Sequence, residues 1–235
     1  RTQPITMSDG EQRQSILVAK LDHMAEMAPL NDGRMGAQLV AVGDGVFLLF
    51  GGSKEYADQD GTINPTPSGF SSVMEINIGS PDTSLAFESV GEMPPRDGGT
   101  GSCDDRVCDR VNFSATLLTK PHDDKGKVLV MGGAYDYLGS KDVSASGFLW
   151  DPTTHTAEVL EGNDAQLLSP TFMHTATEGP QGNVVFAGGS SDSNVDNTFY
   201  ARSDVEIYDP FTRELSLASG TAQGMLIWHS AARLS

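Results

Sequence analysis

Two cysteines are the side chains in this sequence best placed for covalent chemistry. Cys103 and Cys108 are separated by four residues in a glycine-rich segment, where the neighbouring arginines are offset by three aspartates. A reactive thiolate favours a more cationic environment, and a zinc site would need two further ligands, with only His122 close by. The spacing favours a Cys103–Cys108 disulfide, which suits an oxidising compartment, and two free thiols are the alternative.

A second candidate for chemistry is a run of alternating oxygen-bearing side chains. Asp192, Asn194 and Asp196 follow the spacing of the first half of a calcium-binding loop. Asn197 stands where such a loop has glycine, and Ser203 stands where it has glutamate. A solvated loop is therefore the favoured interpretation, calcium is the alternative, and no other cofactor is expected.

The sequence contains no recognisable catalytic motif. It has no nucleophile elbow, no zinc-protease helix motif and no phosphate-binding glycine loop. Of its five histidines, His174 and His229 occupy matching places in similar short segments, and the other three stand alone in polar surroundings.

The elements that would position these side chains form a repeat. Three short apolar runs, at 46–50, 128–131 and 184–187, each end in a glycine pair. A buried strand that runs into two glycines indicates close backbone approach and a change of chain direction. The pairs are Gly51 and Gly52, Gly132 and Gly133, and Gly188 and Gly189.

Each apolar run has the same neighbours along the chain. A segment rich in Ser, Thr and Ala precedes it across a polar turn, at 35–39, 113–117 and 173–177, with a fourth copy at 228–233. Two further strands are predicted after it, at 73–76 and 84–88, 147–152 and 156–160, and 205–210 and 214–217. Four short strands therefore make up each unit.

This order of signals resembles the kelch repeat, the blade of a β-propeller related to the central domain of galactose oxidase. Matched positions at Phe113, His174 and His229 recur at intervals of 61 and 55 residues, and kelch repeats run to about 50 residues. The resemblance predicts an all-β fold, a β-propeller of kelch-type four-stranded blades. The chain is long enough for about four blades, so we expect an incomplete propeller that forms an open arc.

The repeat also predicts how the chain is divided. Residues 1–33 form a partial blade and linker, where a strand is favoured over a helix, and residues 94–111 form the cysteine-containing insertion. Kelch-like blades are expected at 34–93, 112–168 and 169–224, and the first strand of a further blade at 225–235. The remaining blades of the same propeller are an expected partner.

The resemblance also bears on catalysis. Copper-radical oxidases of the galactose oxidase kind carry a Tyr-His metal-binding pair at the start of a repeat strand. Here Met173 and Trp228 stand in place of that tyrosine, before His174 and His229. The resemblance implies that both histidines are framework residues whose rings join neighbouring blades by hydrogen bonds, and neither a catalytic residue nor a transition metal is expected.

The net charge and the composition limit the kinds of partner that the protein is expected to bind. The formal net charge of −17 argues against nucleic acid, whose phosphates require basic surfaces. No run approaches the roughly 20 apolar residues of a membrane span, and no signal peptide is recognised in the sequence as it stands. Acidity and the expected disulfide favour an extracellular or periplasmic location.

Two functions remain as hypotheses. The first is a non-catalytic binding module that presents blade loops at 53–71, 94–111, 134–146 and 190–203 to a protein or glycan partner. The alternative is a part of a secreted carbohydrate-active or copper-radical oxidase-like enzyme whose catalytic residues lie outside this fragment. Flanking sequence with a Tyr-His pair or a catalytic domain would favour the enzyme.

Overall fold

The fold is all-β. The structure is a computed structural model that describes residues 17–20, 23–26, 33–53, 70–79, 86–95, 108–134, 143–162, 165–193, 199–220, 224, 226–227 and 229–231. Sixteen β-strands and no α-helix occur in these ranges. Nothing in the described part of the chain is a helix long and apolar enough to cross a membrane.

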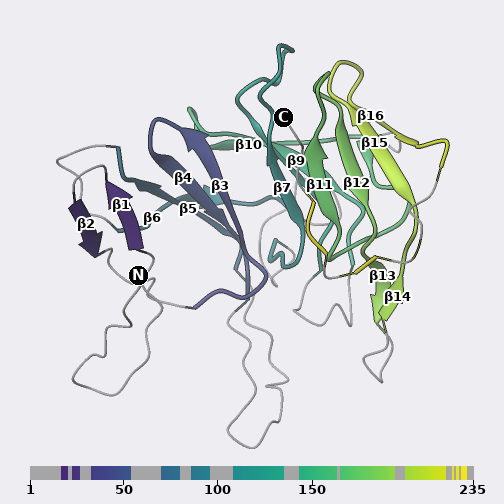
Figure 1. Cartoon of the computed structure of the whole chain (residues 1–235), viewed down its shortest axis with the longest axis horizontal. Helices are drawn as coiled ribbons and strands as arrows, with labels where there is room; N and C mark the ends of the chain where they lie inside the picture. The colour runs from purple at the N-terminus through teal and green to yellow at the C-terminus, as the bar shows by residue number, and fades with distance from the viewer. Residues whose placement is uncertain are drawn as a thin grey trace, which may run out of the picture.

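Twelve of the strands form three antiparallel four-stranded sheets, in which the strands are ordered as in the chain (Figure 1). Blade 1 contains β3 (Gln38–Gly43), β4 (Val46–Phe50), β5 (Ser72–Asn77) and β6 (Glu88–Glu92). Blade 2 contains β7 (Ser114–Leu117), β8 (Val128–Met131), β9 (Gly147–Asp151) and β10 (Thr156–Val159). Blade 3 contains β11 (Thr175–Glu178), β12 (Val184–Ala187), β15 (Val205–Asp209) and β16 (Glu214–Leu217).

Local chemistry explains the strands and their turns. All four residues of β8 are buried apolar side chains, as expected for a central strand covered on both faces. Between β3 and β4 the chain reverses at Asp44 and Gly45, which both have positive φ, at 51° and 80°. Two successive left-handed residues of the Asp-Gly type form a hairpin turn whose twist matches that of the strands.

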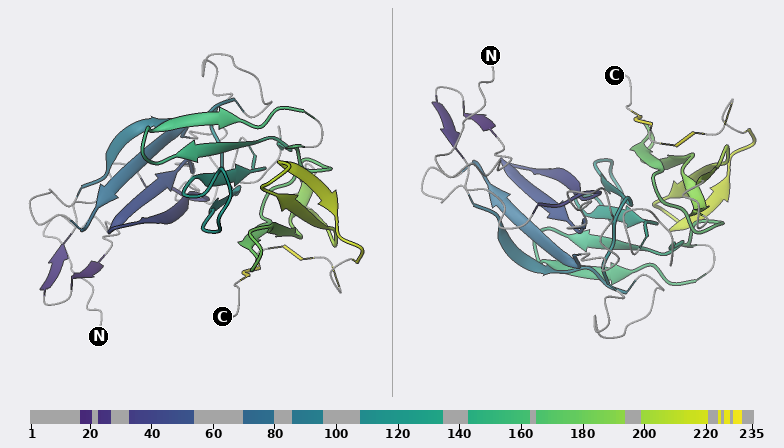
Figure 2. Two further views of the ribbon diagram at one scale, coloured as in Figure 1. Left: turned by 90° about the horizontal axis from the view of Figure 1, so that it is seen from above. Right: turned by 90° about the horizontal axis from the view of Figure 1, so that it is seen from below.

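The three sheets lie face to face in an open arc (Figure 2). The first strands β3, β7 and β11 are neighbours at the inner side of the arc, where β7 contacts both of the others. Apolar side chains fill the junctions between sheets. The blade 1–2 core includes Leu48, Phe50, Val73, Phe113, Val130, Phe148 and Trp150. The blade 2–3 core includes Leu129, Met131, Leu149, Val184, Phe186 and Tyr208.

Two short hairpins complete the described structure. At the N-terminal side, where one strand was expected, β1 (Leu17–Lys20) pairs with β2 (His23–Glu26). Within the expected loop 190–203, β13 (Ser190–Ser193) pairs with β14 (Phe199–Ala201). Ser190 exchanges two backbone hydrogen bonds with Phe172, of 2.9 and 3.0 Å, so the chain is already extended when it leaves the glycine pair.

The last strand of blade 1 differs from its predicted position. The sequence favoured 84–88, whereas β6 spans Glu88–Glu92. The observed register places Glu88 opposite Glu75 and Glu92 opposite Ser72. This register brings Val90 and the fully buried Met93 into the blade 1–2 core, and that burial accounts for the shift.

Candidate functional site

The glycine pairs join each blade to the segment that begins the next repeat. The second glycine of each pair donates its backbone N–H to a carbonyl of that segment. The pairs are Gly52 to Arg110 (2.9 Å), Gly133 to Thr171 (2.8 Å) and Gly189 to Leu226 (2.7 Å). Three equivalent junctions are thus built from backbone contacts, and at the third the partner is the segment at residue 226.

The first glycine of each pair allows a ring to approach the backbone. At Gly132 a Cβ would lie 2.4 Å from the Thr171 carbonyl oxygen and 2.7 Å from the His174 ring. At Gly188 a Cβ would lie 2.4 Å from the Leu226 oxygen and 2.8 Å from the His229 ring. Both glycines have φ near 67° (66° and 67°), in the left-handed region that side chains disfavour.

The two histidines contact the first strand of the preceding blade. His174 Nε2 lies 2.9 Å from Ser114 Oγ, and His229 Nε2 lies 3.0 Å from Thr175 Oγ1. Burial, assisted by the positive charge of Arg202 and by His229, lowers the pKa of His174 to about 3. His174 is therefore neutral at physiological pH and is shielded from solvent within the junction.

A second chain of backbone contacts runs along the inner side of the arc. The N–H of Asn112 donates to Gly36 O over 2.8 Å, and the N–H of Met173 donates to Asn112 O over 2.7 Å. All three residues have positive φ, at 67°, 53° and 58° in chain order. One residue at the start of each blade thus takes the same unusual conformation and is bonded to the next.

Two arginines, the fully buried Arg110 and the partly buried Arg34, bond the strand ends beside the glycine pairs. Arg110 donates to Gly132 O (2.5 Å) and Ser146 O (3.1 Å), and Arg34 makes the matching bond to Gly51 O (2.9 Å). The sequence analysis did not single out these residues, although an arginine two positions before the positive-φ residue recurs in blades 1 and 2.

In blade 3 the arginine beside the junction comes from a different part of the chain. Thr171 occupies the place of the arginine, and Arg202, which forms an isolated bridge with Leu226, donates to the Thr171 hydroxyl. Arg202 also pairs with Glu206 over 3.2 Å. Burial raises the pKa of Glu206, and bonds from the Leu168 N–H and Arg202 oppose that rise.

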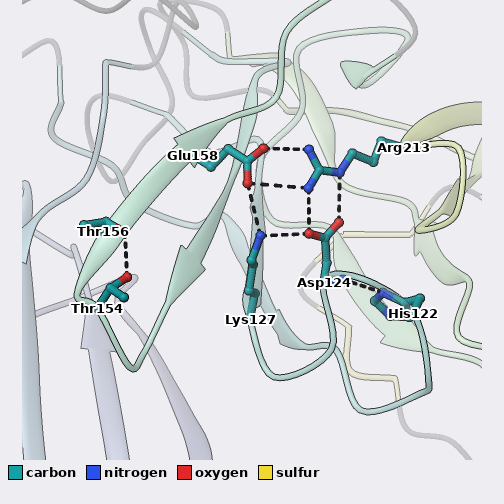
Figure 3. Close-up of polar contacts among 7 residues, drawn as sticks. All are labelled: His122, Asp124, Lys127, Thr154, Thr156, Glu158 and Arg213. Atoms are coloured by element: carbon teal, nitrogen blue, oxygen red, sulfur yellow. Dashed lines mark hydrogen bonds and ion pairs between the residues drawn. The ribbon is translucent and has the colours of Figure 1, made fainter.

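An ionic cluster joins blades 2 and 3 at the opposite end of the sheets (Figure 3). Arg213, in the β15–β16 turn, bonds both oxygens of Asp124 (2.6 and 2.9 Å) and lies 2.6 Å from Glu158 Oε1. Lys127 lies 2.9 Å from Asp124 and 3.1 Å from Glu158. Each cation therefore contacts both carboxylates, and the Asp124 side chain is almost fully buried.

The cluster shifts the pKa values of its members. Burial alone would raise the pKa of Asp124, but hydrogen bonds from Arg213 and Lys127 outweigh it and hold that pKa below its ordinary value. The hydrogen bonds from Arg213 and then Lys127 lower the pKa of Glu158. Carboxylates with depressed folded-state pKa values stabilise the fold above their unfolded pKa, and this stabilisation is lost as pH falls through the folded value.

We therefore expect acid to weaken the blade 2–3 junction below about pH 4. Arg213→Ala should lower the free energy of unfolding at pH 7 by about 2 kcal/mol, because it leaves the buried Asp124 with Lys127 as its remaining ionic partner. The variant should also flatten the acid limb of stability against pH, measured by urea unfolding between pH 3 and 7.

Lys125→Ala is the matched control, since it removes a charge of the same sign from an exposed position in the same turn as Asp124. Its effect should stay within about 0.5 kcal/mol. An equal loss in both variants would show that net charge, rather than the cluster, sets the stability.

The residues singled out from the sequence are not gathered into one site. Cys108 is fully buried, whereas Cys103 lies outside the described residues, so their disulfide stays a prediction. Asn194 and Asp196 also lie outside the described residues, and Asp192 belongs to β13, so the calcium site stays untested. In the described ranges, no group of three or more His, Cys, Asp or Glu could hold a metal ion.

The connections at the two ends of the sheets differ in length. Those at the glycine-pair end, over 51–71, 93–113, 132–146, 160–174 and 188–204, have 15 to 21 residues. Those at the other end, over 44–45, 78–87, 118–127, 152–155, 179–183 and 210–213, have 2 to 10 residues. The glycine-pair end is thus the candidate functional face.

Fold and junctions together define an open arc of a β-propeller-like protein. No protein-family model and no curated protein matches the chain. Among solved structures the chain is similar to the one titled "Structure of YjhT", with a TM-score of 0.57 and 13% sequence identity. The match covers 86% of this chain and 57% of that chain, so the present chain spans little more than half of YjhT. At this identity the likeness shows the fold alone.

Proposed function

We propose that the chain is part of a kelch-type β-propeller that acts as a non-catalytic binding module. In this proposal the long connections at the glycine-pair end contact a protein or glycan partner. The observation that carries it is the difference in connection length between the two ends of the sheets. Binding residues tend to lie on loops that a rigid scaffold positions.

The contacts at the junctions support separate roles for the scaffold, which holds the blades together, and for the connections, which would bind the partner. Backbone hydrogen bonds from the second glycines fix the base of each connection, and the partly buried Arg34 and the buried Arg110 bond the adjacent carbonyls. The contacts that hold the scaffold lie at the bases of the connections, in residues such as Gly133, Arg110 and Ser146, which leaves the other residues of each connection open to specialise for a ligand. The expected disulfide and the net charge of −17 suit an extracellular or periplasmic setting.

The histidines support a non-catalytic assignment. In the copper-radical oxidases that the repeat resembles, a tyrosine precedes the metal-binding histidine. Here Met173 precedes His174, and the His174 ring is buried with its Nε2 atom 2.9 Å from Ser114 Oγ. An enzyme whose catalytic groups lie outside this chain would be favoured by flanking sequence that carries a Tyr-His pair or a catalytic domain.

The experiment compares two replacements in the purified chain. Replacing 135–142 with a short Gly-Ser linker alters the glycine-pair end, and replacing 180–182 with Asn-Gly alters the other end. Binding is measured on a glycan array and against candidate proteins by biolayer interferometry. The first replacement should weaken binding at least about tenfold, and the second should leave it unchanged.

Equal binding by both variants to every ligand that the parent chain recognises would contradict the assigned face. Stoichiometric copper by elemental analysis, with peroxide production from a primary alcohol, would contradict the non-catalytic assignment and favour the oxidase. Circular dichroism of both variants shows whether the sheets are retained.

A further inference from the structure

The turn between the third and fourth strands of a blade carries a side chain that reaches the preceding blade. In blade 2 this residue is His155 and in blade 3 it is Arg213, each three residues after the proline of an Asp-Pro pair. Both are left-handed, with φ of 55° and 61°. The N–H of each donates to the Asp carbonyl that opens the turn, over 2.9 and 2.7 Å. The two turns therefore share one backbone conformation, and the left-handed position holds histidine in one and arginine in the other.

At the blade 2–3 junction this position holds a permanent charge. The guanidinium of Arg213 stays protonated throughout the physiological range and binds Asp124 and Glu158. Both carboxylates have pKa values below their ordinary values, for the reasons given above. This junction therefore keeps its ionic contacts from neutral pH down to mildly acidic pH.

At the blade 1–2 junction the same position holds an imidazole. His155 Nε2 lies 3.1 Å from Glu75 Oε2, and Glu75 in β5 is paired directly opposite Glu88 in β6. Carboxylates directly opposite each other on neighbouring strands repel. A cation at His155 relieves that repulsion, whereas a neutral imidazole does not.

The surroundings of His155 contain further acidic groups and a useful reporter. Strand β6 also carries Glu92, and the turn carries Asp151, whose carboxylate accepts the N–H of Thr153 over 2.7 Å. Among the described ion pairs, His155 is the one cation on Glu75. A Cβ at Gly91 would lie 3.5 Å from the His155 carbonyl oxygen and 2.7 Å from the Trp150 ring, so β6 packs against both.

We propose that protonation of His155 tightens the junction between blades 1 and 2, while Arg213 keeps the junction between blades 2 and 3 closed from neutral to mildly acidic pH. Histidine changes charge between about pH 5 and 8 in proteins. Blade 1 is therefore held less tightly to blade 2 at the upper end of this range.

Trp150 allows this difference to be measured, because it is fully buried in the blade 1–2 core, 6.0 Å from the Phe50 ring. The chain has two tryptophans, so Trp228→Phe leaves Trp150 as the sole tryptophan, which is excited selectively at wavelengths beyond the tyrosine absorption. Acrylamide quenching of this variant is measured at pH 8 and pH 5.5. The quenching constant should be about threefold higher at pH 8, the scale expected for loss of one partly exposed ion pair.

Substitutions in the same background identify the responsible pair. His155→Arg should give low quenching at both pH values, and His155→Gln should give high quenching at both. Glu75→Gln should abolish the difference between the two pH values. His122→Gln, a matched control in a different turn of blade 2, should retain it.

Quenching by the parent that does not change with pH would overturn the proposal. So would an unchanged pH response in Glu75→Gln or in His155→Gln. Should one of these two variants fail to fold by circular dichroism, the parent and the other variant still decide the outcome.

Discussion

Gly132→Ala should destabilise the protein by about 3–5 kcal/mol, because two costs combine at this position. The residue has a φ of 66°, which an alanine adopts only with strain, and the new Cβ would lie 2.4 Å from the Thr171 carbonyl oxygen. That oxygen also accepts the Gly133 N–H that joins blade 2 to blade 3. Relief of the clash therefore requires the blades to separate, and urea unfolding measures the loss.

Gly126→Ala separates the cost of backbone strain from the cost of the Cβ clash. Gly126 lies in the same blade and also has positive φ, at 90°, but a Cβ there would meet nothing within 4 Å. It should lose only about 1 kcal/mol, from backbone strain. If the two alanine variants unfold at the same urea concentration, close packing at the glycine pair does not contribute to stability.

Trp150→Ala should cost about 3–5 kcal/mol and should act mainly on the junction between blades 1 and 2. The indole is 1% exposed, meets Phe50 edge to face at an interplanar angle of 89° and packs against Gly91. Its removal leaves a cavity between two sheets rather than within one. Hydrogen exchange should therefore rise in β4 and β5 before it rises in β12 and β15.

Two variants calibrate this result. Trp150→Phe should cost much less, about 1–2 kcal/mol, because it keeps a ring in place and removes an indole nitrogen that has no hydrogen-bond partner in the described structure. Phe211→Ala truncates a ring that is 67% exposed and should stay within about 0.5 kcal/mol. A loss of similar size in Phe211→Ala and Trp150→Ala would contradict the junction as the main source of stability.

The sequence predicted the all-β fold and the open arc because the signals involved are local. An apolar run that ends in two glycines reports a buried strand and a close approach within a few residues, as at Val128–Met131. The β13–β14 hairpin was missed because the polar residues after Gly189 carry no strand signal of their own. Its geometry depends on the bridge between Ser190 and Phe172, a contact between segments separated in the chain.

The junction side chains were harder to predict for the same reason. The turn that carries Arg213 is visible in the sequence as Asp-Pro, and its equivalence with His155 could have been noticed. Its partner Asp124 lies 89 residues earlier, in a turn of another blade. A single sequence gives no indication that these two turns are in contact, so the ionic cluster could be recognised only in the structure.

The backbone bonds that link Gly36, Asn112 and Met173 explain how the repeats can diverge so far. The side chain differs at each of the three positions, because each of the two bonds joins main-chain atoms. The two bonds span 76 and 61 residues of the chain, so connections of different length reach the same contact. Neighbouring blades can therefore keep this contact while their side chains and connection lengths diverge, and the likeness to YjhT is likewise one of fold, at 13% sequence identity.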